Sequence, residues 1–596
     1  MRSVLHLGRT FRLVWSIAPG WTAANIALAV VQGLLPLVGL YMMKLIVDGV
    51  TKGITATDKS AAFRDVAVLL VIAGLVGLAI ALARSAASLV SEAQGQAVTD
   101  FISDMIHAKS IAVDLEYYEN SKYYDVLHRA QQEAPFRPTK IVADLVMVGQ
   151  NMVSLLGVIG LLARLHWSIG LIIVAAAVPG AYVKLRYSSR LFFWQRDTTV
   201  ADRRSWYYHW LLTQGDLAKE IRLFGIGEVV RGWFHDIRTK LRRERLGITA
   251  RRSAADLASA VVAVIAVYGT FTYIVWRTIQ GAISLGSMVM YYQAFQTGLG
   301  ALQQVLQGLA GLYEDNLFLT YLHEFMALEP KVVDPPRPVA VPRPMREGIV
   351  FDDVTFAYPD TERTALEHVS LAIRPGEVSA LVGPNGSGKT TVVKLLCRLY
   401  DPSGGRITID GTDLRQFRVD ELRRGMSVIF QDFAQYHLTA RENIWVGDVE
   451  RAPDDAAIET AARESGADEL IAGLEGGYET ILGKLFEDGE ELSTGEWQKV
   501  ALARAFVRDA EVLVLDEPTS ALDPLAEWRA FEQIRALAQG RAVVLISHRF
   551  STVRNADRIH IVDHGRIVES GTHDELMRLD GQYARMYEVQ ARAYRG

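Results

Sequence analysis

The chain has 596 residues, a formal net charge of −5 and 50% hydrophobic residues. This length is too great for one core, so we expect two or more domains. Cys397 is the only cysteine, which excludes a disulfide within one chain and a cysteine-protease domain ahead of the apolar region. We expect no nucleic-acid partner.

Uncharged apolar runs dominate the first half of the chain. A helix needs about 20 apolar residues to cross a bilayer, and six runs reach or approach this length, at 21–43, 66–83, 145–163, 165–183, 257–276 and 278–313. Buried helices of a large soluble protein would explain one such run but not six. The sequence therefore predicts an all-α transmembrane domain with six helices. The first run is too long for a signal peptide, so no cleaved presequence is expected.

The positions of Lys and Arg predict the orientation of these helices. Sixteen Lys or Arg residues lie in 184–256 and six in 84–144, whereas they are sparse on the other side, for example at Lys52, Arg164 and Arg277. The positive-inside rule then places the N-terminus, both long connections and the C-terminal half in the cytoplasm. Structureless loops of this length are uncommon, so we expect the spanning helices to continue into the connections.

A proline-rich segment separates the apolar half from the rest. Residues 330–344 hold six of the 18 prolines, a composition typical of an extended, semi-rigid linker. Beyond it, short runs such as EVSALV, MSVIF, EVLVLD, AVVLIS and RIHIVD alternate with helical stretches, which predicts a layered α/β domain with a largely parallel sheet. The expected domains are a transmembrane domain at 1–329, a linker at 330–347 and an α/β domain at 348–596.

The segment GPNGSGKTT at 383–391 lies between an apolar run and a helix-like run. Glycines let backbone N–H groups close around phosphate, the helix N-terminus adds its positive dipole end, and the Lys and Thr side chains reach the outer phosphates and Mg²⁺. A flexible Gly-Ser loop is the alternative, which the downstream motifs make negligible. The predicted ligand is ATP or GTP, with Thr390 also a Mg²⁺ ligand. The predicted binding residues are Gly383, Pro384, Asn385, Gly386, Ser387, Gly388, Lys389, Thr390 and Thr391.

Two adjacent acids end another predicted strand. In EVLVLDEPTSALD, apolar residues lead to Asp516 and Glu517. Such a pair alone is often a solvated turn, but a phosphate loop upstream favours a catalytic role. We expect Asp516 to hold Mg²⁺, directly or through a water, and Glu517 to orient or deprotonate the attacking water.

With these motifs in this order, the chain resembles an exporter-type ATP-binding cassette (ABC) half-transporter, in which one transmembrane domain is fused to one P-loop ATPase domain. The resemblance also rests on Tyr358 in VTFAYPD, Gln431 in VIFQD, Ser520 to Asp523 in SALD and His548 in LISHR. It implies that Tyr358 stacks on adenine and that Gln431 serves both Mg²⁺ and catalysis. It also implies that Asp523 contributes to the nucleotide site and that His548 stabilises charge on the γ-phosphate.

The family's signature LSGGQ is present as LSTGE at 492–496. In the family this loop and helix N-terminus bind the γ-phosphate held by the other cassette of a dimer, a role that would belong to Ser493 and Gly495. Thr494 adds a Cβ where the family has glycine, and Glu496 adds an acid where it has glutamine. Both changes could weaken closure on ATP. Since the catalytic acid and histidine are intact, we expect a functional site.

Over the membrane half, YYENSKYYDVLHRA and KEIRLFGIGEVVRGWF occupy the places of the family's coupling helices. An amphipathic helix without such a role is the alternative for each. The resemblance implies an ATP- and Mg²⁺-dependent ATPase that drives efflux by alternating access in the bacterial inner membrane. It also implies a dimer, with a second copy of this chain as the default partner. An exporter-fold importer and an ATP-gated channel or regulator stay open as alternatives.

The sixth apolar run is unusually polar. Lipid-facing helices rarely tolerate such polarity, so we expect part of it to face a cavity or a second copy, with hydrogen bonding between helices as an equal alternative. The substrate stays open among peptide, lipid, glycan and amphipathic drug, although LSTGEWQK and the preceding KLFEDGEE resemble bacterial peptide-export half-transporters more than lipid flippases. The polar residues of the run are Tyr291, Tyr292, Gln293, Gln296, Gln303, Gln304 and Gln307.

Overall fold

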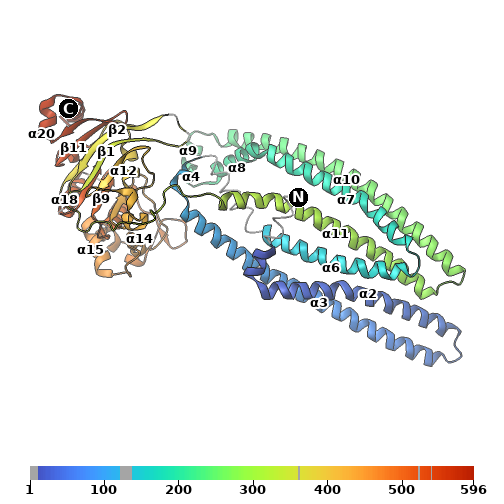
Figure 1. Cartoon of the computed structure of the whole chain (residues 1–596). Coiled ribbons are helices and arrows are strands. Elements are labelled where there is room, and N and C mark those ends of the chain that lie inside the picture. The colour runs from blue at the N-terminus through green and yellow to red at the C-terminus, as the bar shows by residue number, and fades with distance from the viewer. Residues whose placement is uncertain are drawn as a thin grey trace. The chain divides into compact units, whose positions relative to one another are not determined.

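The computed structural model describes residues 11–120 and 137–595, apart from 216, 360, 362, 521–523 and 539. The chain divides into two compact units, whose elements are labelled in Figure 1. The helical unit comprises the described residues of 1–112 and 121–328. The sheet unit comprises 329–596 together with 113–120, which include the short helix α4 (Leu115–Glu119). Most of the first predicted coupling segment, YYENSKYYDVLHRA, lies outside the described residues.

Long helices build the helical unit (Figure 1). α2 packs along α3, α6 along α11 and α7 along α10. α3 and α10 have 54 and 53 residues, so each is about 80 Å long, compared with about 30 Å for the hydrocarbon core of a bilayer. The helices thus continue into the long connections, as predicted. In chain order they are α2 (Pro19–Thr55), α3 (Lys59–Ala112), α6 (Arg137–Ala163), α7 (Ser168–Asp197), α8 (Thr199–Thr213), α9 (Ala218–Leu223), α10 (Gly227–Ile279) and α11 (Leu285–Met326).

Five helices among the described residues are long and apolar enough to cross a membrane, namely α2, α3, α6, α7 and α10. They contain the first five predicted apolar runs, except that α7 begins three residues after the start of the run at 165–183. α11 contains most of the sixth run and has 42 residues, but glutamines such as Gln303, Gln304 and Gln307 lower its hydropathy. Length and composition therefore identify a multi-pass membrane protein, and the sixth span stays a prediction.

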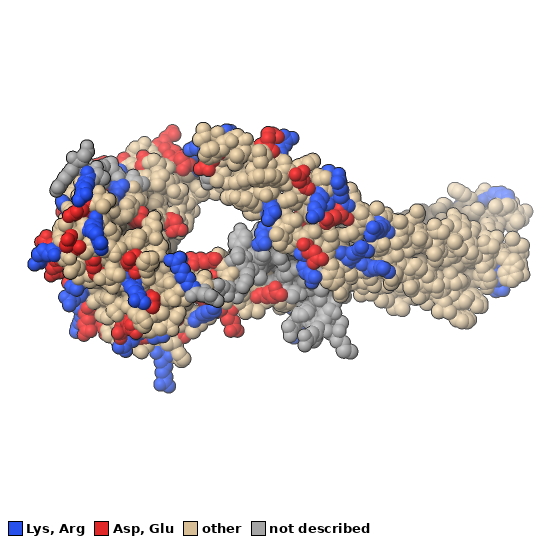
Figure 2. Space-filling view, turned by 90° about the horizontal axis from the view of Figure 1, so that it is seen from above, with Lys and Arg blue, Asp and Glu red and all other residues tan. Residues whose placement is uncertain are grey.

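Charged residues avoid a long part of the helical unit. Figure 2 shows this part as a nearly uninterrupted tan surface. On α3, large apolar side chains are exposed, for example those of Leu75 at 61% and Leu82 at 62%. Inside the unit, Val158 and Phe295 belong to an apolar core that α6, α7 and α11 share. Apolar side chains both inside and outside a helical bundle are typical of a bundle surrounded by lipid.

The sheet unit contains a largely parallel sheet, as predicted, with the strand order β12-β11-β3-β10-β9-β6 and only β12 antiparallel. A second, antiparallel sheet with the order β2-β1-β4-β5 was not predicted. The strands are β1 (Ile349–Ala357), β2 (Thr364–Ile373), β3 (Val378–Val382), β4 (Gly404–Ile409), β5 (Thr412–Asp413), β6 (Met426–Ile429), β7 (Ile481–Leu482), β8 (Gly489–Glu490), β9 (Val512–Asp516), β10 (Ala542–Ile546), β11 (Arg558–Asp563) and β12 (Arg566–Gly571).

Two apolar cores cover the larger sheet. β3 is buried along its whole length, and its side chains alternate between the cores, so that Ala380 belongs to one and Leu381 to the other. A strand buried on both faces explains the continuous apolar run in the sequence. The helices of this unit are α12 (Lys389–Leu396), α13 (Val419–Arg424), α14 (Ala440–Trp445), α15 (Asp455–Ser465), α16 (Asp468–Ala472), α17 (Thr494–Phe506), α18 (Pro524–Leu537), α19 (Phe550–Val553), α20 (His573–Leu579) and α21 (Gln582–Arg595).

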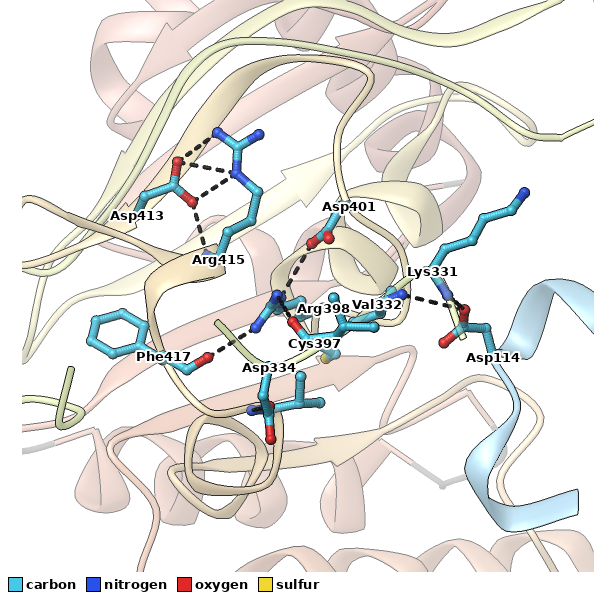
Figure 3. A network of polar contacts seen from close by, with 12 residues as sticks. Asp114, Lys331, Val332, Asp334, Cys397, Arg398, Asp401, Asp413, Arg415 and Phe417 are labelled. Atoms are coloured by element: carbon cyan, nitrogen blue, oxygen red, sulfur yellow. Dashed lines mark hydrogen bonds and ion pairs between the residues drawn. The ribbon is translucent and has the colours of Figure 1, made fainter. Parts of the chain in front are cut away.

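The start of the proline-rich linker is bound within the sheet unit, together with residues 113–120 (Figure 3). Asp114 Oδ2 accepts a hydrogen bond from the backbone N–H of Lys331 at 2.5 Å. The buried Arg398 donates to the carbonyl oxygen of Val333 at 2.9 Å. The sequence predicted an extended linker but not the place of 113–120, because its partners lie more than 200 residues away in the chain.

Candidate nucleotide-binding and hydrolysis site

The predicted site residues follow neighbouring strands of the larger sheet. The phosphate loop follows β3, and Asp516 ends β9. His548 lies two residues after β10, and Gln431 lies two residues after β6. These four strands are adjacent and parallel, so their carboxyl ends meet at one edge of the sheet. This edge is where open α/β sheets bind their ligands.

Two glycines of the phosphate loop have no room for a side chain. Gly388 has a φ of +112°, and a Cβ there would lie 3.0 Å from the carbonyl oxygen of Ala365. At Gly383, a Cβ would lie only 2.0 Å from the carbonyl oxygen of Val562. Gly388 directly precedes α12, so the loop leads into the N-terminus of a helix, where backbone N–H groups favour anions.

Lys389 and Ser387 are placed for phosphate in this loop. Lys389 Nζ donates to the carbonyl oxygens of Gly383 and Pro384, both at 2.9 Å. Burial lowers the pKa of Lys389, and the charges of Asp516 and Glu517 oppose this effect. Ser387 is buried, and its Oγ has no hydrogen-bond partner within the part of the chain that the structure describes. A phosphate oxygen would satisfy this hydroxyl and would compete with the two carbonyls for the ammonium group.

Asp516 lies beside the first turn of α12. Its Oδ2 accepts a hydrogen bond from Thr390 Oγ1 at 3.2 Å, and the residue is buried. Burial, assisted by the charge of Glu517, raises the pKa of Asp516 to about 6. A hydroxyl and a carboxylate at this distance are oxygen ligands of the kind that Mg²⁺ prefers, and a bound cation would favour the ionised carboxylate. The residues therefore fit the predicted ion.

Glu517 is held by both its side chain and its backbone. Its Oε1 lies 3.2 Å from His548 Nδ1, and its Oε2 accepts a hydrogen bond from Gln431 Nε2 at 3.3 Å. Its backbone has a φ of +51°, a left-handed conformation that costs about 1 to 2 kcal/mol for a residue with a Cβ. Such strain is often found at functional sites. The three predicted catalytic residues thus meet at one carboxylate.

Gln498 also contacts this group, and the sequence analysis missed it. Its side chain is buried, and Nε2 donates to the carbonyl oxygen of Glu517 at 3.0 Å. Gln498 lies on α17, the helix that begins at the signature, so it links that helix to the loop that follows β9. Because its partner is a backbone carbonyl, only its place in LSTGEWQK could have indicated it.

Glu496 has a structural role at the start of α17. The backbone N–H of Ser493 donates to Glu496 Oε2 at 2.7 Å, and the N–H of Glu496 donates to Ser493 Oγ at 3.4 Å, which together form a capping box. Hydrogen bonds from the backbone and the side chain of Ser493 to the carboxylate lower the pKa of Glu496. The carboxylate is thus engaged at a helix N-terminus, where negative charge is favourable. This geometry accounts for an acid in the signature without assuming a damaged site.

We expect Glu496→Ala to loosen the start of α17 and Glu496→Gln to preserve it, because glutamine can also accept the hydrogen bond from Ser493. Loss of a cap costs about 1 kcal/mol, so amide hydrogen exchange at 493–497 should become roughly 5-fold faster in the alanine variant. Hydrogen-exchange mass spectrometry of the full chain measures this. If Glu496→Gln abolished ATP turnover, the acid would have a role other than capping.

Tyr358, the predicted adenine platform, lies in an aromatic cluster. Its hydroxyl is 3.0 Å from Thr391 Oγ1, at the end of the phosphate loop. Its ring meets Phe356 and Tyr400 edge to face, with 5.0 and 5.5 Å between the ring centroids. Lys394 Nζ lies 5.2 Å from the centroid of the Tyr358 ring. The predicted platform and the phosphate loop are therefore neighbours.

Other predicted residues are not brought to this site. Among the described residues, no hydrogen bond or ion pair joins Ser493 or Gly495 to the phosphate loop of the same chain. Asp523 lies outside the described residues. The second predicted coupling segment, KEIRLFGIGEVVRGWF, forms α9 and the start of α10 in the helical unit.

Comparison with known proteins gives a consistent result. Residues 366–520 match the family described as "ABC transporter". The chain is 29% identical to the "Subtilin transport ATP-binding protein SpaT" of Bacillus subtilis, over 98% of this chain and 94% of that protein. It is 31% identical to an "ATP-dependent lipid A-core flippase" of Methylobacillus flagellatus, over 76% of this chain and 75% of that protein.

A solved structure has the same fold over nearly the whole chain. The structure of a bacterial Atm1-family ABC exporter with ATP bound matches with a TM-score of 0.82 at 24% identity, and the match covers 97% of this chain and 99% of that one. The relatives extend over both units, and the site contains the ATPase motifs in order. The chain therefore belongs to the ABC transporter family, as an exporter that joins membrane helices and an ATP-binding ATPase domain in one polypeptide.

Proposed function

We propose that two copies of this chain form a transporter that couples ATP hydrolysis to efflux by alternating access. The observation that carries the proposal is the convergence of Glu517, His548 and Gln431 beside the phosphate loop. A symmetric dimer would place the signature of each copy against the phosphate loop of the other and so complete two equal sites. ATP would then bind best when the two sheet units are closed, so that binding and hydrolysis favour different states of the helices.

Each site residue has a distinct role in this proposal. Lys389 and the loop N–H groups bind phosphate, and Glu517 accepts the proton of the attacking water. His548 stabilises charge that develops on the γ-phosphate. It lies 3.2 Å from Glu517, so both groups are at the same place in the site. When bound, Mg²⁺ would neutralise phosphate charge. Its ligands would come from Thr390, Asp516 and Gln431, while Tyr358, Ser493, Gly495 and Asp523 would complete the nucleotide site.

We further propose a location in the bacterial inner membrane, with the sheet unit in the cytoplasm. The concentration of Lys and Arg in 184–256 supports this orientation. α11 would then be the sixth span, because an even number of spans returns the chain to its starting side. Its glutamines would face a cavity or the second copy rather than lipid.

A polar cavity in the helical unit is our candidate for the substrate site. It has a volume of about 290 Å³ and lies between α7, α10 and α11, where Lys184, Arg252, Asp256, Gln303 and Gln307 line it beside several alanines. Charges of both signs next to amide groups and small apolar groups suit a ligand with amine, carboxylate and amide groups. Such a lining favours a peptide over a uniformly apolar ligand.

The direction of transport is tested with inside-out membrane vesicles. ATP should drive accumulation of substrate in these vesicles, because their cytoplasmic face is outward. Accumulation only in right-side-out vesicles with internal ATP would instead indicate an importer. ATP hydrolysis without any movement of substrate would indicate a channel or regulator.

The cavity predicts a variant that affects the substrate and not ATP. Asp256→Asn with Gln303→Leu should raise the Kd for a co-purified peptide by at least about 10-fold and so reduce the amount retained, since each lost polar partner costs about 1 kcal/mol or more. Basal ATPase activity should stay within about 2-fold. Native mass spectrometry measures the retained ligand. A co-purified lipid that the double variant retains at full occupancy would contradict the peptide proposal.

A further inference from the structure

We propose that Glu119 is a positioning residue for the adenine platform, so that residues 113–120 help to set the affinity for nucleotide. This inference rests on the proposed role of Tyr358 in stacking on adenine. In the chain, Glu119 belongs to the connection between α3 and α6, which are membrane-length helices. In the structure, it ends α4 and lies within the sheet unit.

The carboxylate of Glu119 holds two side chains of the sheet unit. Its Oε1 accepts a hydrogen bond from Lys394 Nζ at 2.6 Å, and its Oε2 accepts one from the Tyr400 hydroxyl at 2.7 Å. Short distances of this kind are typical of charge-assisted hydrogen bonds. Only 19% of the Lys394 side chain is exposed, so water screens this ion pair less than a surface pair.

Both partners of Glu119 contact the ring of Tyr358. Lys394 Nζ lies 5.2 Å from the ring centroid, within cation–π range, and Tyr400 meets the ring edge to face at 5.5 Å and 87°. Burial lowers the pKa of Lys394, but the hydrogen bond to Glu119, the Glu119 charge and the contacts with Tyr358 together outweigh burial. The net pKa is therefore raised, and the amine stays charged. One carboxylate thus fixes two of the groups that determine where the platform ring lies.

Other contacts hold α4 in place without Glu119. Asp114 accepts a hydrogen bond from the backbone N–H of Lys331, as Figure 3 shows. Glu116 Oε1 lies 2.7 Å from Lys331 Nζ. Leu115 packs against one of the apolar cores. Loss of the Glu119 charge should therefore leave α4 docked. Glu116→Gln provides a matched control, because it removes a salt bridge of the same helix that does not involve Tyr358.

The test compares ATP with inorganic tripolyphosphate, which has phosphates but no base. Glu119→Gln should raise the Kd for ATP roughly 3- to 10-fold, a part of what stacking on an aromatic ring contributes, while the Kd for tripolyphosphate and kcat stay within about 2-fold. Displacement of a fluorescent ATP analogue from the purified full-length protein measures both affinities. Glu116→Gln should leave both unchanged. In a Tyr358→Ala background, Glu119→Gln should have no further effect on ATP.

The possible outcomes separate the inference from the proposal beneath it. If Tyr358→Ala weakens ATP binding and Glu119→Gln does not, only the role of Glu119 is wrong. An equal loss for ATP and tripolyphosphate, or an equal loss in Glu116→Gln, would also overturn it and indicate simple docking of α4. If Tyr358→Ala leaves ATP affinity unchanged, the platform itself is wrongly assigned and the inference is rejected with it.

Discussion

Glu517→Gln is expected to retain ATP binding while turnover falls by roughly 10²- to 10⁴-fold, the contribution of a positioned general base. Glutamine has nearly the same shape and can keep a hydrogen bond with Gln431, but it cannot take a proton from water. ATP binding should survive because the phosphate loop and Tyr358 are unchanged. The ATP-bound form should therefore accumulate.

Steady-state ATPase activity and retention of labelled ATP after gel filtration measure the two effects. Glu511→Gln is a matched control at the opposite end of the same strand from Asp516 and Glu517. The Glu511 side chain accepts a hydrogen bond from the backbone N–H of Met345 at 3.1 Å. It should leave turnover within about 2-fold. Hydrolysis near the parent rate in Glu517→Gln would show that another group acts as the base.

Mixed dimers should show that each nucleotide site is shared between two chains. Lys389→Ala should disable the phosphate loop and Ser493→Arg the signature, so a dimer with either substitution in both copies should lose nearly all turnover. A dimer of one Lys389→Ala chain and one Ser493→Arg chain differs. One of its sites has both defects, whereas the other joins an intact lysine to an intact serine, because the two groups come from opposite copies.

Differently tagged chains and tandem purification isolate the mixed dimer, and vanadate trapping of labelled nucleotide counts its sites. We expect about one trapped nucleotide per mixed dimer and almost none in either parent variant, even if transport needs two working sites. Normal hydrolysis by the Ser493→Arg dimer, or no trapping in the mixed dimer, would contradict a site built from two identical chains. A different partner chain would then have to supply the signature.

The candidate catalytic groups could be singled out from the sequence because each lies in a short motif at the end of a strand. Parallel pairing then brings β3, β10, β9 and β6 together, so residues far apart in the chain meet without any further sequence signal. The sequence analysis assigns Glu496 an effect on closure around ATP, although Ser493 and Glu496 have the spacing of a capping box, which indicates a structural role.

The contacts that the sequence did not predict join distant parts of the chain through common residue types. Gln498 contacts a backbone carbonyl, which leaves no pattern. Glu119 and Lys394 are 275 residues apart, and their pairing depends on where α4 docks. The antiparallel sheet was missed because its strands were treated as part of one α/β layer. In each case tertiary packing, rather than local preference, determines the contact.

Because α3 is one unbroken helix, the number of its residues determines the direction in which the chain leaves it. An α-helix turns by about 100° per residue, so one residue inserted between the apolar stretch and Ala112 would rotate everything beyond it by about that angle. An insertion of seven residues would restore the original direction to within about 20°. Residues 113–120 follow this helix directly in the chain, so the direction in which the chain leaves α3 depends on the number of residues in the helix as well as on their identity.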